Sequence, residues 1–214
     1  MYSSGSSHSV LTAHADPVHG LAWLNGSGDS EGLILSGCER GSIIAHDSRS
    51  RNPAWTLNLN LNSVLAEGGG AGVCCFSSAT ASSDSSYADS GDSLVVAGCT
   101  SGFICVINAT RRSIAAVHKP HTDDVRSVAI LDSARIRPGS ASLRIATTSF
   151  DGLGALWSYN PHLSSFQLET MLRGHTDKIL GVCCGIRNSA VEILTTGADG
   201  KAILWTEQKA AQIR

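Results

Sequence analysis

A glycine recurs at the same place in four segments of this chain, each time five residues before the residue that closes an apolar run. The glycines are Gly41, Gly102, Gly152 and Gly200, and the closing residues are His46, Ile107, Trp157 and Trp205. Each glycine lies between two short runs rich in Val, Ile, Leu, Thr and Cys, which is typical of β-strands. Because glycine supplies the positive φ that tight hairpins need, the register predicts four similar β-hairpins.

A further apolar run precedes each hairpin, so the chain consists of four repeats of three runs each. The fourth repeat is the clearest, with ILGVCC, EILTTGADG and AILWT, whereas the second, with AGVCCFS, LVVAGCTSG and FICVIN, is the most eroded. No helical period of useful length interrupts the runs. The sequence therefore predicts an all-β fold.

Composition narrows the class of protein and of partner. Hydrophobic residues make up 42% and charged residues 16% of the 214 residues, so the chain can bury a core. Sixteen basic and eighteen acidic residues, without a basic stripe, argue against a nucleic-acid partner. The N-terminal segment does not resemble a secretory signal, and no run approaches the ~18 apolar residues of a membrane span. We expect an intracellular protein, cytoplasmic or nuclear, with no membrane partner.

The fourth repeat, with Gly174-His175, Asp199 and Trp205, resembles a WD repeat, the four-stranded blade of a β-propeller. The resemblance covers residues 9 to 206, although no repeat keeps the Trp-Asp dipeptide whole. It implies a propeller of four four-stranded blades at residues 13–60, 61–118, 119–172 and 173–206. A strand at residues 7–12 would complete the last blade. Residues 77–93, rich in Ser and Asp, are expected to form a disordered loop.

In WD repeats a histidine, a Ser or Thr, an aspartate and a tryptophan form a structural hydrogen-bonded chain. The resemblance implies two such chains here, made by His175, Thr195, Asp199 and Trp205 and by His121, Thr147, Asp151 and Trp157. In the first repeat Arg40 and His46 replace the acid and the tryptophan, so that chain is expected to be broken. The second repeat has none of the four residues. We therefore expect the first two blades to be the softer half of the chain, that is, less stable than the last two.

The alternative to a structural role is catalysis, with His175 as a general base held by Asp199. That mechanism needs a nucleophile, and no G-x-S-x-G, H-E-x-x-H or P-loop pattern occurs. The seven cysteines show no C-x-x-C spacing and read as free thiols. We predict a non-enzymatic protein without catalytic residues, metal or cofactor.

The four repeats leave the closure of the ring open, because propellers hold about 4 to 8 blades. Three arrangements are considered, in order of preference. The chain is part of a longer propeller, or two chains form a homodimeric ring of eight blades, or the chain is a small four-bladed ring.

The resemblance implies that partners bind to the loops before the first strand and between the second and third. The residues expected there are Asp123, Asp124, Asp177, Lys178 and Phe150. We therefore predict a scaffold that presents a propeller surface to other proteins and assembles a multiprotein complex. In addition, IIAHDSR at residues 43–49 resembles the W-D-x-R ending of substrate receptors of cullin-RING ubiquitin ligases, with Arg49 as its arginine. A noncatalytic ligase subunit is therefore the alternative function.

Overall fold

The computed structural model describes residues 10–24, 32–47, 49–50, 52–78, 93–131, 142–187 and 190–207. Their strands form four antiparallel sheets that follow one another along the chain. Blade 1 contains β1 (Val18–Leu24), β2 (Leu33–Cys38), β3 (Ser42–Asp47) and β4 (Pro53–Asn58). Blade 2 contains β5 (Val73–Ser78), β6 (Leu94–Cys99), β7 (Ile104–Asn108) and β8 (Ser113–His118). Blade 3 contains β9 (Val125–Leu131), β10 (Leu143–Ser149), β11 (Gly154–Asn160) and β12 (Ser165–Leu172). Blade 4 contains β13 (Ile179–Arg187), β14 (Ala190–Gly197) and β15 (Ala202–Thr206). The all-β expectation is confirmed.

The hairpins between the second and third strands have the backbone geometry that the glycine register predicts. The φ angles are +79° at Gly41, +82° at Gly102, +79° at Gly152 and +75° at Gly200. At Gly102 a side chain would also collide with the backbone of His121, because the turn lies directly against that residue. Glycine is therefore required there both for its conformation and for its size.

Blade 4 differs from the expectation, because its sheet has three strands over the described residues. The strand expected at residues 7–12 is not formed over Val10–Thr12, and residues 7–9 lie outside the described part. Val10 and Leu11 are exposed, so these apolar side chains gain little burial where they lie. β15 therefore ends the fourth sheet in the described part of the chain.

The link between blades 1 and 2 contains two short helical elements that the sequence analysis did not predict. They are the 3₁₀ helix η1 (Leu59–Leu61) and the helix α1 (Ser63–Glu67). The Asn58 side chain accepts from the Asn60 amide and the Asn62 side chain from the Val64 amide, which caps both N-termini. A further 3₁₀ turn, η3 (Thr100–Gly102), joins β6 to β7. Of the loop expected at residues 77–93, Ser77 and Ser78 belong to β5, while residues 79–92 lie outside the described part.

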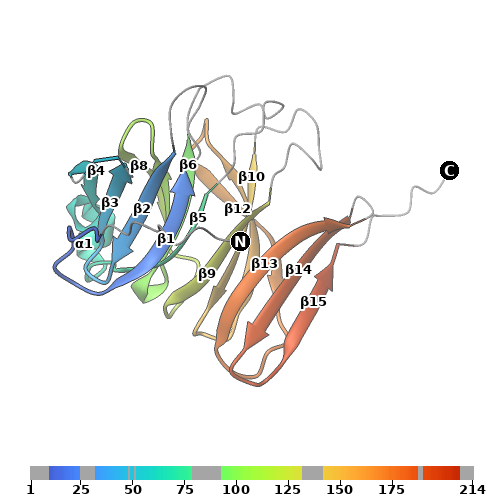
Figure 1. Ribbon diagram of the computed structural model, residues 1–214. Coiled ribbons are helices and arrows are strands. Elements are labelled where there is room, and N and C mark those ends of the chain that lie inside the picture. Colours follow the sequence, from blue (N-terminus) through green and yellow to red (C-terminus); the bar gives the residue numbers. More distant parts are fainter. Residues whose placement is uncertain are drawn as a thin grey trace, which may run out of the picture.

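The four blades form an open arc (Figure 1). Their first strands lie side by side, because β1 contacts β5, β5 contacts β9 and β9 contacts β13. Within the described residues no comparable contact joins β13 to β1. The blades fan out from blue to red in Figure 1, with β13, β14 and β15 at one end of the arc.

The hydrophobic cores lie between successive blades. Leu35 and Ile43 of blade 1 pack with Val95 and Ile107 of blade 2. The next two cores join blade 2 to blade 3, with Val96, Val106, Ile145 and Trp157, and blade 3 to blade 4, with Ala146, Leu156, Val191 and Ile193. Each blade is thus stabilised by its neighbours rather than by a core of its own.

Candidate functional site: hydrogen-bonded networks and the loop face

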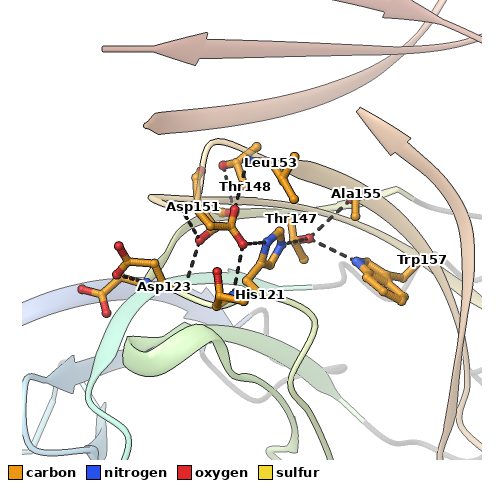
Figure 2. Close-up of polar contacts among 12 residues, drawn as sticks. His121, Asp123, Thr147, Thr148, Asp151, Leu153, Ala155 and Trp157 are labelled. Carbon is orange, nitrogen blue, oxygen red and sulfur yellow. Dashed lines mark hydrogen bonds and ion pairs between the residues drawn. The ribbon is translucent and has the colours of Figure 1, made fainter. Parts of the chain in front are cut away.

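Blade 3 holds a chain of four polar side chains that links its first three strands (Figure 2). His121, which precedes β9, has its Nδ1 3.0 Å from Asp151 Oδ2 and its Nε2 2.9 Å from Thr147 Oγ1. The Trp157 indole N–H of β11 donates to the same hydroxyl at 3.1 Å. Asp151, in the β10–β11 turn, also accepts the amides of Thr122 and Leu153.

The proton positions in this chain follow from what each group can do. A carboxylate only accepts, so His121 Nδ1 donates to Asp151. Burial lowers the pKa of His121, although the neighbouring Asp151 opposes this effect, so the imidazole is neutral at pH 7 and its Nε2 accepts. Thr147 then donates to Nε2 and accepts from Trp157. Every polar group in the chain has a partner.

Blade 4 repeats the same arrangement. His175 Nδ1 lies 2.9 Å from Asp199 Oδ1, its Nε2 lies 2.9 Å from Thr195 Oγ1, and the Trp205 indole donates to Thr195 at 2.9 Å. Burial raises the pKa of Asp199, but hydrogen bonds from His175 and from two backbone amides outweigh it and lower the pKa to about 2. The hydroxyl in the chain belongs to Thr195, which is buried, and not to its exposed neighbour Thr196.

Blade 1 keeps more of the chain than expected. His14 Nε2 lies 2.7 Å from Ser36 Oγ, and His46 Nε2 lies 2.8 Å from the same oxygen, so an imidazole takes the place of the indole. The expectation of a broken chain is wrong for these two bonds. The carboxylate end is missing, because Arg40 stands at the position of the acid and pairs with Asp16 at 2.9 Å, so His14 Nδ1 is buried without a partner. Burial lowers the pKa of both histidines.

Blade 2 has no polar chain. Ala97 and Ile107, at the hydroxyl and tryptophan positions, are fully buried in the core between blades 1 and 2. Apolar contacts therefore occupy the space that the hydrogen-bonded chain fills in blades 3 and 4.

Asp199, His175 and Thr195 follow the order of an acid, a base and a nucleophile, as in a catalytic triad. A nucleophilic hydroxyl must meet its substrate, but Thr195 and Thr147 are fully buried and each already accepts an indole N–H. Among the described residues, no group of three or more His, Cys, Asp or Glu side chains is placed to hold a metal ion. In the same part of the chain, no helix is long and apolar enough to cross a membrane. The buried hydrogen-bonded chains of blades 3 and 4 suit a structural role.

The predicted partner-binding residues meet on the loop face, where turns of blades 2, 3 and 4 adjoin. Phe150 is partly exposed, with Lys178 Nζ 4.5 Å and Arg126 Cζ 5.0 Å from its ring centroid. The Phe150 amide donates to the Asp124 carbonyl at 3.0 Å. The Asp124 carboxylate accepts the Ser101 amide of blade 2 at 3.1 Å. Arg126, on β9, was not predicted, since only its contact with Phe150 in space reveals it.

Two further candidates on this face make local contacts. Asp123 accepts the next amide along the chain at 2.7 Å, and Asp177 accepts the Lys178 amide at 2.7 Å. The Asp123 carbonyl also accepts the Ser149 hydroxyl at 2.9 Å. These bonds hold the backbone of the loops and leave both aspartates exposed.

Arg49 lies apart from the loop face, beyond the end of β3 that is remote from the Gly41 turn. Its guanidinium binds the Asp47 carboxylate through two bonds of 3.0 and 2.8 Å, and its amide binds Asp47 at 2.9 Å. These hydrogen bonds lower the pKa of Asp47 to about 2.

Comparisons with known proteins agree on the fold. No protein-family model matches the sequence, and no curated protein matches it significantly. A chain of a mitotic checkpoint complex is similar in structure, with a TM-score of 0.64 and 18% identity over 93% of this chain and 52% of that one. The WD40 repeats of RRP9 give a TM-score of 0.57 and 19% identity over 92% and 53%. The computationally designed Ika4 protein gives a TM-score of 0.59 and 15% identity over 94% and 98%.

The present chain thus spans about half the length of the first and second of these chains. Its sheets follow one another as blades, and blades 3 and 4 carry the His, Thr, Asp and Trp chains that a WD repeat implies. The fold of this chain is that of a WD-repeat β-propeller.

Proposed function

We propose that this chain is a non-catalytic scaffold that binds other proteins through its loop face. The observation that carries the proposal is the group around Phe150, a partly exposed aromatic ring whose centroid lies 5.0 Å from Arg126 Cζ and 4.5 Å from Lys178 Nζ. Aromatic residues and arginine are enriched in protein interfaces relative to the rest of the surface.

The rigidity of the loops supports this function. Backbone bonds fix Phe150 to Asp124 and Ala198 to Lys178, and the Asp124 side chain ties blade 3 to blade 2. A surface held in one conformation loses little entropy on binding, which favours affinity. The buried hydrogen-bonded chains beneath the turns would serve the same purpose, because they hold the Asp151 and Asp199 turns in place.

The test compares the proteins that co-purify with the tagged full chain and with two variants. Phe150→Ala removes the anchor, whereas Leu163→Ala removes an apolar side chain that is 73% exposed in the β11–β12 connection. We expect Phe150→Ala to reduce the recovery of specific partners at least about tenfold, the effect of ~1.4 kcal/mol, and Leu163→Ala to leave it unchanged. Equal recovery with both variants, at equal thermal stability, would refute the loop face as the binding surface.

A substrate receptor of a cullin-RING ligase is the second candidate function. Arg49 is exposed, is held in one orientation by Asp47, and lies away from the loop face, which leaves that face free for a substrate. On this hypothesis Arg49→Ala abolishes co-purification of ligase subunits while the proteins that depend on Phe150 are retained. Retention of ligase subunits by Arg49→Ala would exclude this role for Arg49.

A further inference from the structure

The two ends of the arc expose the two halves of a blade interface. Each blade has a forward face toward the next blade and a rear face toward the preceding one. Among the described residues, the contacts that cover these faces inside the arc are absent at the forward face of blade 4 and at the rear face of blade 1.

The forward faces share a cross-strand row on their first three strands. The rows are Ala22–Leu35–Ala45, Ser77–Val96–Val106, Ala129–Ala146–Leu156 and Cys183–Leu194–Leu204. In blades 1 to 3 the residues of the second and third strands are buried in the core shared with the next blade. In blade 4 the corresponding Leu194 and Leu204 are 38% and 56% exposed.

The rear faces are covered in blades 2 to 4 and exposed in blade 1. In every blade the pairing of the first strand with the second shifts its register once. The shift comes directly after Val18, Val73, Val125 and Ile179, so the four first strands can be aligned at these residues. In this alignment Leu21 corresponds to Phe76, Val128 and Val182, which all pack into the core shared with the preceding blade. Leu21 is 68% exposed, and Trp23, two residues along the same face, is 54% exposed.

A glycine in blade 1 shows how the two faces fit together. The Phe76 ring lies so close to Gly20 that a side chain there would come within 2.9 Å of it. Gly181 has the same position in blade 4, and among the described residues an added side chain would meet only Thr196 Oγ1 of the same sheet within 4 Å. In this part of the chain the slot at Gly181 is therefore empty, and a residue in the Phe76 position of a following blade would fill it. On blade 1 that residue is Leu21.

We propose that a second copy of this chain covers both faces, so that blade 4 of each copy packs against blade 1 of the other. The single chain carries one face of each kind, so a two-fold pair forms two identical interfaces and leaves neither face open. This chain covers 52% and 53% of two similar WD-repeat chains, so two copies together have about the length of one of them. Two copies would thus make one ring of eight blades.

The test is the solution mass of the full chain, measured by light scattering after size exclusion. We expect twice the chain mass of 22.3 kDa at micromolar concentration. A monomer, or a polydisperse series of larger species, would overturn the proposal, the latter because the end faces would then not close on each other.

Variants on the two faces show whether a dimer uses them. Leu21→Glu and Leu204→Glu each place a charge in both interfaces, and we expect either variant to be monomeric, with unchanged far-ultraviolet circular dichroism. Leu163→Glu, a matched change at a side chain that is 73% exposed elsewhere, should remain dimeric. If Leu21→Glu and Leu204→Glu also remain dimeric, the copies meet at another surface and the proposal is wrong.

Discussion

At the scale of single residues, one buried hydroxyl holds each polar chain together. Thr195 receives the Trp205 indole N–H and donates to His175, so both neighbours depend on it. Buried polar groups without partners are costly, which makes the hydroxyl more important than its single bonds suggest.

Thr195→Val should therefore lower the free energy of unfolding by about 1–3 kcal/mol, because it leaves the ring nitrogens of His175 and Trp205 without their hydroxyl partner at almost constant volume. Urea unfolding measures the effect. Thr196→Val, at the exposed neighbouring position, is the matched control and should change stability by less than about 0.5 kcal/mol. Equal effects of the two substitutions would contradict the hydrogen-bonded chain.

Asp199 makes the stability of the protein depend on pH in the acid range. Its pKa in the folded protein is about 2, below the ~3.9 of an unfolded chain, so its contribution to stability is present above pH ~4 and is lost as the pH falls toward 2. Asp199→Asn should remove this part of the acid dependence when the free energy of unfolding is measured between about pH 5 and pH 2, the range that includes both pKa values. An unchanged slope in the variant would show that Asp199 is not held as described.

The sequence predicts these residues where a local pattern fixes them. The turn glycines and the residue five positions later set the register. This register predicts the places of Asp151 and Asp199 and of the tryptophans Trp157 and Trp205. The choice of Thr195 over Thr196 depended on strand parity, which the register also supplies. The bond between Ser36 and His46 was missed because an imidazole can replace an indole donor only if the two rings lie alike, and a residue pattern does not show that.

At the scale of elements, burial follows position in the arc rather than motif content. Every residue of β6 and β7 is buried although blade 2 has no polar chain, whereas β15 alternates between exposed and partly buried residues although blade 4 has a complete one. Blade 2 has a neighbour on each side, and blade 4 has one in the described part of the chain. This burial argues against the expectation that blades 1 and 2 form the softer half.

Hydrogen exchange measured by mass spectrometry distinguishes the two views. In the monomeric variant Leu21→Glu, where no second copy covers blade 4, we expect the amides of β6 and β7 to exchange most slowly and those of β15 to exchange much faster, because local opening costs least where few buried contacts are lost. The slowest exchange in blade 4 would instead show that the polar chain dominates local stability. Leu21→Glu provides the monomeric reference for this comparison.

At the scale of the whole molecule, the repeat count predicts the number of blades but not how the arc ends. The WD-repeat resemblance implies a strand at residues 7–12 that completes the last blade, and over Val10–Thr12 this strand is not formed. Closure depends on contacts between distant segments or between chains, so no local pattern contains it. The end faces become visible only when the four aligned blades are compared in space.

The central claim is that the two end faces are halves of one interface, and a cross-link between them tests it most directly. Inside the arc, Ser77 Oγ accepts the Ile130 amide at 3.1 Å, and Cys183 and Trp23 stand at the corresponding positions. Cys183 is exposed, and Leu21 lies two residues from Trp23, about 7 Å along the strand. Leu21→Cys treated with a short bis-maleimide should give covalent dimers that disappear when Cys183→Ser is added. If Leu21→Cys gives no more covalent dimer than the chain without this substitution, treated with the same reagent, the claim is contradicted.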